Sequence, residues 1–262
     1  MKKATILHLF LFVSFITTAQ TYSVTYNVHQ KFIHEIHNNE GQSNSLLASV
    51  GQPFLTELKK QDSIREATAP VKIYNLIYCN GVSTYTLFQG KKTAEQAPAL
   101  ENQSNIRSIS ISVGSGEAGV LYKNFPNKII LREDAIFDKP FLITDTLQPI
   151  NWIIDTATKT IGKFNCTKAT ATIKGQPVEA WFTADIPISD GPDRLYGLPG
   201  LILAANATNG NYEATEIKIN NENTVLQQPN KGTVVTGAEY GRLTKEKLDN
   251  FINSIKNGNI EL

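Results

Sequence analysis

Apolar and polar residues alternate along most of the chain, and this two-residue period is typical of half-buried β-strands. In the first such segment the apolar positions are Tyr22, Val24, Tyr26 and Val28. Residues 71–88 continue the pattern but are interrupted by Asn80-Gly81, a dipeptide that favours a two-residue hairpin turn. A second pair of segments is joined through Asn209-Gly210. The pattern predicts strands over residues 22–33, 71–88, 106–113, 119–122, 128–131, 140–144, 152–155, 160–174, 177–184, 201–205 and 212–220.

A helical period is clear only near the C-terminus, where apolar residues recur at Leu248, Phe251, Ile252 and Ile255. Thr244 suits an N-cap and Gly258 suits a C-terminal stop, so we expect the last helix to lie between them. A weaker pattern after Pro53 leaves a second, N-terminal helix open. The chain is therefore predicted to be mainly β: a curved antiparallel sheet or incomplete barrel with a C-terminal helix on one face.

The first residues have the three parts of a secretory signal peptide. Lys2 and Lys3 form a positive start, residues 6–16 are almost entirely apolar, and small residues lead up to Ala19. We expect cleavage after Ala19, which leaves residues 20–262 as a single β-rich domain. No later stretch is long and apolar enough to span a bilayer, so the protein is predicted to be exported, in the periplasm or at the cell surface. Any membrane contact is expected to be peripheral.

Composition and charge exclude two classes of protein. The chain has 25 Lys and Arg against 24 Asp and Glu, a net charge of +1, and 41% of its residues are hydrophobic. A disordered chain has fewer apolar residues and a larger net charge. A nucleic-acid binder that works through bulk charge needs a surplus of Lys and Arg. We therefore expect a folded protein that does not bind nucleic acid.

Motifs for catalysis, metal binding and cofactor binding are all incomplete. His34 and His37 flank a Glu as in zinc proteases, but they are three residues apart rather than four. Ser115 lacks the flanking glycines of a nucleophile elbow. The G-x-G-x-x-G pattern over residues 114–119 is not followed by the helix that a dinucleotide site requires. The sequence predicts no catalytic residues, no metal site and no cofactor, and favours a protein that is not an enzyme.

Two cysteines, Cys79 and Cys166, lie in the part of the chain predicted to be exported. One disulfide is an open alternative in an oxidising compartment. Two buried thiols in separate strands are the other, because only adjacent strands with well-aimed Cβ atoms can be bridged.

The most informative run starts at a strand with the sequence A-W-F-T and continues through an I-P-I corner and a Gly-Pro step. It ends in the hexapeptide G-L-P-G-L-I over residues 197–202. Proline cannot donate to an interior ladder, so the chain should leave the sheet at the corner and re-enter it as a buried strand. The residues that mark this run are Trp181, Pro187, Gly191, Pro192, Gly197, Leu198, Pro199, Gly200, Leu201 and Ile202. They are candidate site residues with a structural or a binding role, and the sequence does not decide between the two.

This run resembles the GLPGLI family of exported bacterial proteins, and the resemblance is strong over about residues 119–205. It implies an envelope protein of Gram-negative bacteria and brings no assigned catalytic residues. Cys166 matches a family position and Cys79 does not, which weakens the disulfide alternative. At the level of fold, the chain is also similar to periplasmic lipoprotein carriers, whose incomplete barrel has an apolar concave face.

Three functions follow as expectations. The first is a soluble, non-enzymatic envelope protein that binds an apolar or lipid-like ligand in the concave face of its sheet. The second is an envelope interaction or structural protein without a ligand, whose partner is another envelope protein. The third is an unrecognised hydrolase, which no residue of the sequence supports. A fold likeness alone does not establish function, so the site must decide among them.

Overall fold

The computed structural model describes residues 20–31, 60, 63–64, 66–88, 119–137 and 139–256. Its strands are β1 (Thr21–Gln30), β2 (Lys72–Cys79), β3 (Val82–Leu87), β4 (Leu121–Asn124), β5 (Ile129–Ile136), β6 (Lys139–Thr146), β7 (Ile153–Ile161), β8 (Phe164–Ile173), β9 (Gln176–Thr183), β10 (Leu201–Ala207), β11 (Gly210–Asn220) and β12 (Thr233–Thr236). These described strands form one open sheet in the order β12-β6-β5-β4-β3-β2-β1-β11-β10-β9-β8-β7. Every pairing among them is antiparallel except β12 with β6. The prediction of a mainly β, mostly antiparallel fold is confirmed.

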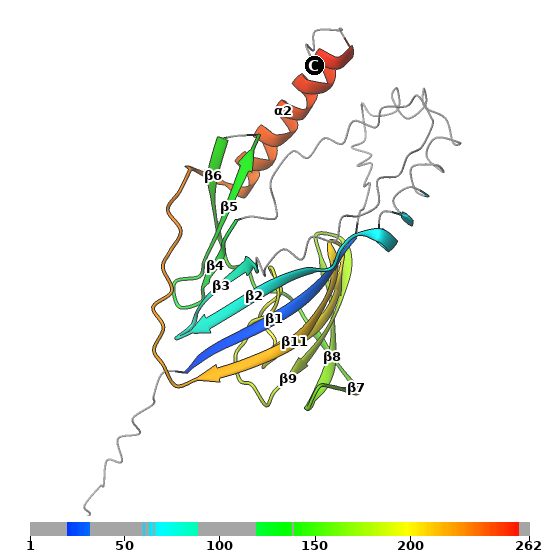
Figure 1. Ribbon diagram of the computed structural model, residues 1–262, viewed down its shortest axis with the longest axis vertical. Helices are drawn as coiled ribbons and strands as arrows, with labels where there is room; N and C mark the ends of the chain where they lie inside the picture. The colour runs from blue at the N-terminus through cyan, green and yellow to red at the C-terminus, as the bar shows by residue number, and fades with distance from the viewer. Residues whose placement is uncertain are drawn as a thin grey trace, which may run out of the picture.

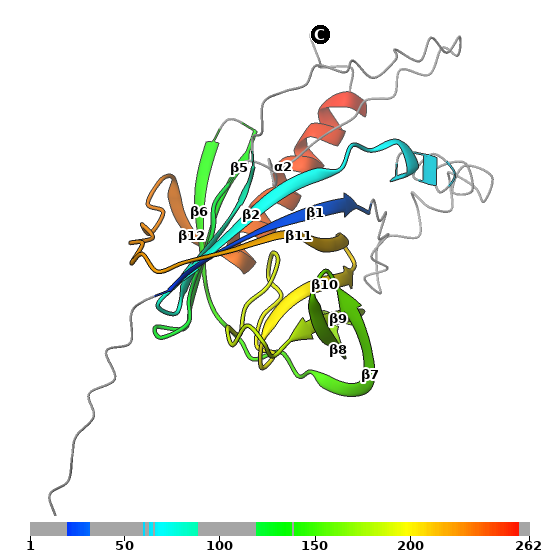
Figure 2. The ribbon, with the colours of Figure 1, turned by 60° about the horizontal axis from the view of Figure 1, so that its bottom comes forward.

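The first strand divides the sheet into two halves. β1 pairs with β2 on one side and with β11 on the other, and Val24 and Tyr26 at its centre are fully buried. The half that runs from β10 to β7 turns away from the half that runs from β2 to β6 (Figures 1 and 2). The sheet is therefore strongly curved, and its inner face carries the main buried cluster.

Turn chemistry explains where the strands break. Asn80 and Gly81 both have positive φ, 50° and 77°, as a tight hairpin turn between β2 and β3 requires. Lys174 and Gly175 do the same between β8 and β9, with φ of 50° and 79°. The single strand predicted over residues 160–174 is wrong, because Gly162 adopts φ 58° and ends β7 before β8 begins.

The C-terminal helix, α2 (Gly237–Lys256), begins about two turns earlier than predicted. Its N-cap is Thr236, whose hydroxyl oxygen accepts a hydrogen bond from the Glu239 N–H at 3.2 Å. Thr244 lies inside the helix and donates to the Tyr240 carbonyl at 2.8 Å, so the N-cap predicted at Thr244 is wrong. The helix packs through Tyr240 on a small cluster with Ile136, Ile143 and Val235.

Several sequence predictions lie outside the described residues, among them the signal peptide over residues 1–19, the strand over 106–113 and the helix stop at Gly258. Of the second helix that was left open after Pro53, residues 60, 63–64 and 66–68 are described and are helical. Within the described part of the chain, no helix has the length and apolar character needed to cross a membrane.

Candidate functional site

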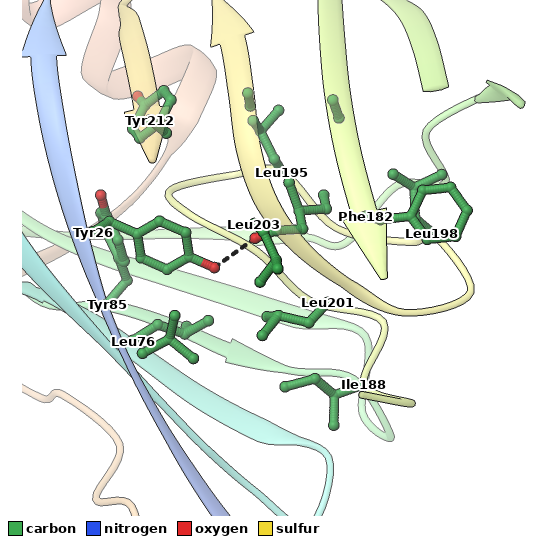
Figure 3. Packing of buried hydrophobic residues seen from close by; sticks show 14 of the residues in the cluster. Tyr26, Leu76, Tyr85, Phe182, Ile188, Leu195, Leu198, Leu201, Leu203 and Tyr212 are labelled. Carbon is green, nitrogen blue, oxygen red and sulfur yellow. Dashed lines mark hydrogen bonds between the residues drawn. The ribbon is translucent and has the colours of Figure 1, made fainter. Parts of the chain in front are cut away.

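Residues 184–200, which we call the corner, fold back onto the inner face of the sheet. Four of its side chains, Ile186, Ile188, Leu195 and Leu198, are buried in the main cluster (Figure 3). The same cluster contains Tyr26, Leu76 and Tyr85 from β1, β2 and β3. The Tyr26 hydroxyl donates to the carbonyl of Ile202 at 2.7 Å, which ties β1 to the strand that follows the corner. The chain therefore fills the inner face beside β1–β3 with its own side chains.

The glycines of the corner are required by backbone geometry. Gly197 has φ 90°, a conformation that L side chains rarely adopt. A Cβ on Gly200 would lie 2.0 Å from the carbonyl oxygen of Thr183. A Cβ on Gly191 would lie 2.7 Å from the Cβ of Ile202. These glycines therefore allow the corner to lie directly on β9 and β10.

A buried ion pair anchors the corner to β4. The side chains of Lys123 and Asp190 are both inaccessible to solvent and form a salt bridge. The Lys123 ammonium also donates to the carbonyls of Gly191 at 3.0 Å and Asp193 at 2.9 Å. Asp190 Oδ1 accepts a further hydrogen bond from the Gly191 N–H at 2.8 Å. All three ammonium protons thus have acceptors in the corner, as a buried charge requires.

Sequence reasoning missed this pair, although one signal was available. Strand alternation places Lys123 on the same face as Leu121, which lies in the main cluster. A lysine at an inward position predicts a buried acidic partner. The partner could not be identified, because Asp190 lies 67 residues further along the chain.

Trp152 is hydrogen-bonded to the corner, whereas Trp181 lies on β9. Trp152 Nε1 donates to the Tyr196 carbonyl at 2.8 Å, and the Tyr196 hydroxyl donates to the Gln148 carbonyl at 2.7 Å. These bonds fix the corner to the segment before β7. Trp181 is separate from the corner: its ring lies beneath the Lys159 ammonium, 4.3 Å from the ring centroid.

The candidate site residues therefore divide into three groups. The corner and the start of β10 bury Gly191, Pro192, Leu198, Gly200, Leu201 and Ile202. Three others lie exposed on the corner, namely Pro187, Gly197 and Pro199. Trp181 stands apart on β9 and its ring is half-buried. Most of the motif is thus part of the packing of the protein, and the open space lies beside it.

That open space is a groove of about 640 Å³ beside the corner. One wall comes from β4, β5, β6 and residues 148–151, and the other from the end of β8, Lys174, Arg194 and Tyr196. Its apolar lining consists of Leu121, Ile130, Ile143, Pro149, Ile150 and Ile173. Leu121 and Ile130 also pack on the main cluster, so the groove opens from the inner face of the sheet.

A second hollow of about 500 Å³ adjoins the groove. The two share four lining residues, Arg132, Ile173, Lys174 and Arg194. Three of these carry positive charge, so cations line the place where the hollows meet. The carboxylates that line one hollow or the other are Asp145 and Asp193.

Both carboxylates already have partners within the fold. Asp145 Oδ1 accepts a hydrogen bond from the Gly237 N–H at the start of α2, at 3.1 Å. Asp193 Oδ2 accepts one from the Asn209 side chain at 2.8 Å. Among the described residues, neither Asp145 nor Asp193 forms a salt bridge with a cation of the junction, and Arg132 pairs instead with Asp134.

Other titratable groups suggest no reaction. Both Cys79 and Cys166 are buried free thiols, so the disulfide alternative is wrong for this structure. Burial raises the pKa of the Cys166 thiol, which opposes nucleophilic thiolate formation. His29 is exposed on β1, whereas His34, His37 and Ser115 lie outside the described residues. The described residues contain no group of three or more His, Cys, Asp or Glu side chains placed to hold a metal ion.

A family model matches the part of the chain that contains the corner. Residues 172–204 match a family described as "Protein of unknown function (Porph_ging)". The match covers β9, the corner and the start of β10, and so includes the hexapeptide over residues 197–202. A search of curated proteins gave no match.

Among solved structures, the chain is similar to PNGF-II. One crystal form, in space group P21, gives a TM-score of 0.50 and 16% sequence identity, and another, in C2, gives 0.48 and 15%. The alignments cover 86% of this chain in both cases, and 33% and 32% of the PNGF-II chains. This chain thus spans about a third of the length of PNGF-II. At such identity the first likeness shows a shared fold and carries no activity.

Proposed function

We propose that this is a non-enzymatic envelope protein that binds an apolar or lipid-like ligand in the groove beside the corner. The observation that supports the proposal is the groove itself, an open space of about 640 Å³ on the inner face of the sheet, whose lining combines six apolar residues with polar and charged ones. Pockets for small ligands usually have volumes of about 300–1,000 Å³ and are lined mainly by apolar side chains. A ligand would occupy only this part of the inner face, because the corner fills the part beside β1–β3.

The apolar lining provides the binding free energy in this proposal. Each buried methylene contributes about 0.8 kcal/mol, so an alkyl chain gains affinity with every carbon that the groove covers. Ile130 lies on β5, Ile143 on β6 and Ile150 in the loop before β7, and all three line the same wall of the groove. An aliphatic chain that packs along this wall would bury at least the face that contacts the isoleucines.

A titration calorimetry experiment with dodecanol tests the proposal. We expect saturable binding to the wild-type protein and loss of at least about tenfold in affinity in Gln148→Trp, because Gln148 is exposed and lines the groove. Gln227→Trp makes the same change at an exposed position away from the groove and should bind as wild type. Equal binding by both variants, or no binding by the wild type, would contradict the proposal.

A second candidate, assembly through strand pairing, is favoured by the edge strand β7. Its residues are exposed except for the partly exposed Ile161, and Ile153 is 72% exposed. The sequence I-I-D-T-A-T-K-T-I is self-complementary about Ala157: antiparallel pairing with a second copy would set Asp155 opposite Lys159 twice. Pairing two such edges about a two-fold axis closes the assembly as a dimer.

Exchanging the charges of Asp155 and Lys159 tests whether two copies of the protein pair through β7. Sedimentation should show a dimer for the wild type and a monomer for Lys159→Asp, which sets two carboxylates opposite each other. The double variant Asp155→Lys/Lys159→Asp restores complementarity and should restore the dimer. A wild-type protein that sediments as a monomer, or a double variant that stays monomeric while the wild type pairs, would overturn the second candidate.

A further inference from the structure

The junction of the two hollows gathers positive charge from three separate elements. Arg132 comes from β5, Lys174 from the β8–β9 turn and Arg194 from the corner. Within the part of the chain that the structure describes, neither Lys174 nor Arg194 is in an ion pair. Both are exposed at the mouth of the groove. Arg132 pairs with Asp134, so Lys174 and Arg194 are the two cations of the junction without an ion-pair partner among the described residues. An anion that lay between the three cations would be attracted by all of them.

Arg132 is held in place for such an anion. Its guanidinium pairs with Asp134 and lies over the Tyr240 ring, 5.4 Å from the centroid. Nevertheless, its buried Nε atom has no hydrogen-bond partner among the described residues. A buried donor without an acceptor costs about 1–3 kcal/mol. The Nε atom is itself inaccessible, so a ligand in the groove reaches Arg132 through the 26% of its side chain that is exposed.

We infer that the ligand of the groove is an amphiphile with an anionic head group, a carboxylate or a phosphate, held by Arg132, Lys174 and Arg194. This inference rests on the proposed function, since the groove supplies the site for the tail. The fork of an arginine suits the paired oxygens of a carboxylate or phosphate, and lysine adds a mobile point charge. The tail then lies along the wall formed by Ile130, Ile143 and Ile150.

Three ligands with the same tail test the inference by titration calorimetry: dodecanoate, dodecyl phosphate and dodecanol. We expect at least one anion to bind the wild type about tenfold or more tightly than dodecanol, the effect of one charge-assisted hydrogen bond. In Lys174→Gln/Arg194→Gln that advantage over dodecanol, measured within the variant itself, should fall below about threefold. The matched control Lys218→Gln/Arg242→Gln also removes two exposed charges, outside the groove, and should keep the advantage.

The outcomes separate this inference from the function on which it rests. If dodecanol binds as tightly as both anions, the inference is overturned and the proposed function stands. If none of the three ligands binds, both are overturned. Tight binding of dodecanoate alone supports the inference and indicates a fatty acid, whereas tight binding of dodecyl phosphate supports it and indicates a phospholipid head group. The inference would also be overturned if the affinity advantage of the anions over dodecanol fell equally in Lys174→Gln/Arg194→Gln and in Lys218→Gln/Arg242→Gln.

Discussion

Lys123 and Asp190 form an ion pair whose two side chains are both completely buried. The pair joins β4, in one half of the sheet, to the corner that precedes β10 in the other half. Asp190 Oδ2 is buried and has no hydrogen-bond partner among the described residues, so the aspartate depends heavily on the lysine for compensation of its charge. The pair is therefore one of the contacts that hold the corner, and with it one wall of the groove, in place, beside the hydrogen bonds of Trp152 and Tyr196.

Removing one member of the pair should be costly. Lys123→Met leaves a buried carboxylate without its cation and should lower the free energy of unfolding by about 3–5 kcal/mol. Lys123→Met/Asp190→Leu removes both charges and should lose much less than the sum of the two single changes. Urea denaturation of the four proteins completes the cycle. Additive losses would show that the two charges do not stabilise each other.

The glycines of the corner should differ in their sensitivity. Gly200→Ala places a methyl group against the Thr183 backbone and should destabilise the fold by well over about 1 kcal/mol. A Cβ on Gly197 would meet only Trp152 Nε1, at 3.9 Å, but the residue keeps an unfavourable φ, so Gly197→Ala should cost about 1 kcal/mol. Gly241→Ala is the control: it lies inside α2 with no atom nearby and should stabilise by about 0.5–1 kcal/mol. We expect the denaturation midpoint to be lowest for Gly200→Ala, intermediate for Gly197→Ala and highest for Gly241→Ala. A Gly200→Ala protein as stable as the wild type would contradict the close approach of the backbones.

The two threonines near the start of α2 give a test of where the helix begins. Thr236→Ala removes the N-cap and should cost about 1 kcal/mol of stability. Thr244→Ala replaces a residue in the helix interior by a better helix former and should be neutral or slightly stabilising. Thermal unfolding followed by circular dichroism measures both. The opposite ranking would move the start of the helix to Thr244, as its sequence alone suggests.

Alkaline titration should report on the contact between α2 and β5. Burial, together with the Asp134 carboxylate, raises the pKa of Tyr240 to about 12. Its phenol is therefore neutral in both states below about pH 10, the ordinary tyrosine pKa, and the stability that it contributes is lost between about pH 10 and 12. Tyr240→Phe should lose less stability than the wild type over that interval. Urea denaturation at pH 10 and pH 12 measures the stability of both proteins. If the wild type and Tyr240→Phe lose the same stability between these pH values, a raised pKa at Tyr240 is contradicted.

Much of the fold could be predicted because its signals are local. Strand alternation shows directly in the residues of β1, and Asn80-Gly81 encodes its own turn geometry. β12 was not predicted because it has four residues and pairs with β6 from far along the chain. The N-cap at Thr236 was missed because Gly237 and Gly241 weaken the helical pattern that follows it.

The site was harder to predict than the fold because its parts are distant in sequence. The hexapeptide lies at the end of the corner, yet its Leu198, Gly200 and Leu201 are buried and serve packing rather than forming the open surface. Arg132, Lys174 and Arg194 come together only through the curvature of the sheet and the path of the corner. Each of the three looks like an ordinary surface cation in the sequence.

Native mass spectrometry of the protein purified from its own cell envelope tests the central claim most directly. The account predicts an adduct with the mass of a lipid-like molecule, which is lost on extraction with organic solvent. The same adduct should be absent from Gln148→Trp and present in Gln227→Trp. A bare polypeptide mass for the wild type, under conditions that preserve a known lipid complex, would contradict a ligand in the groove.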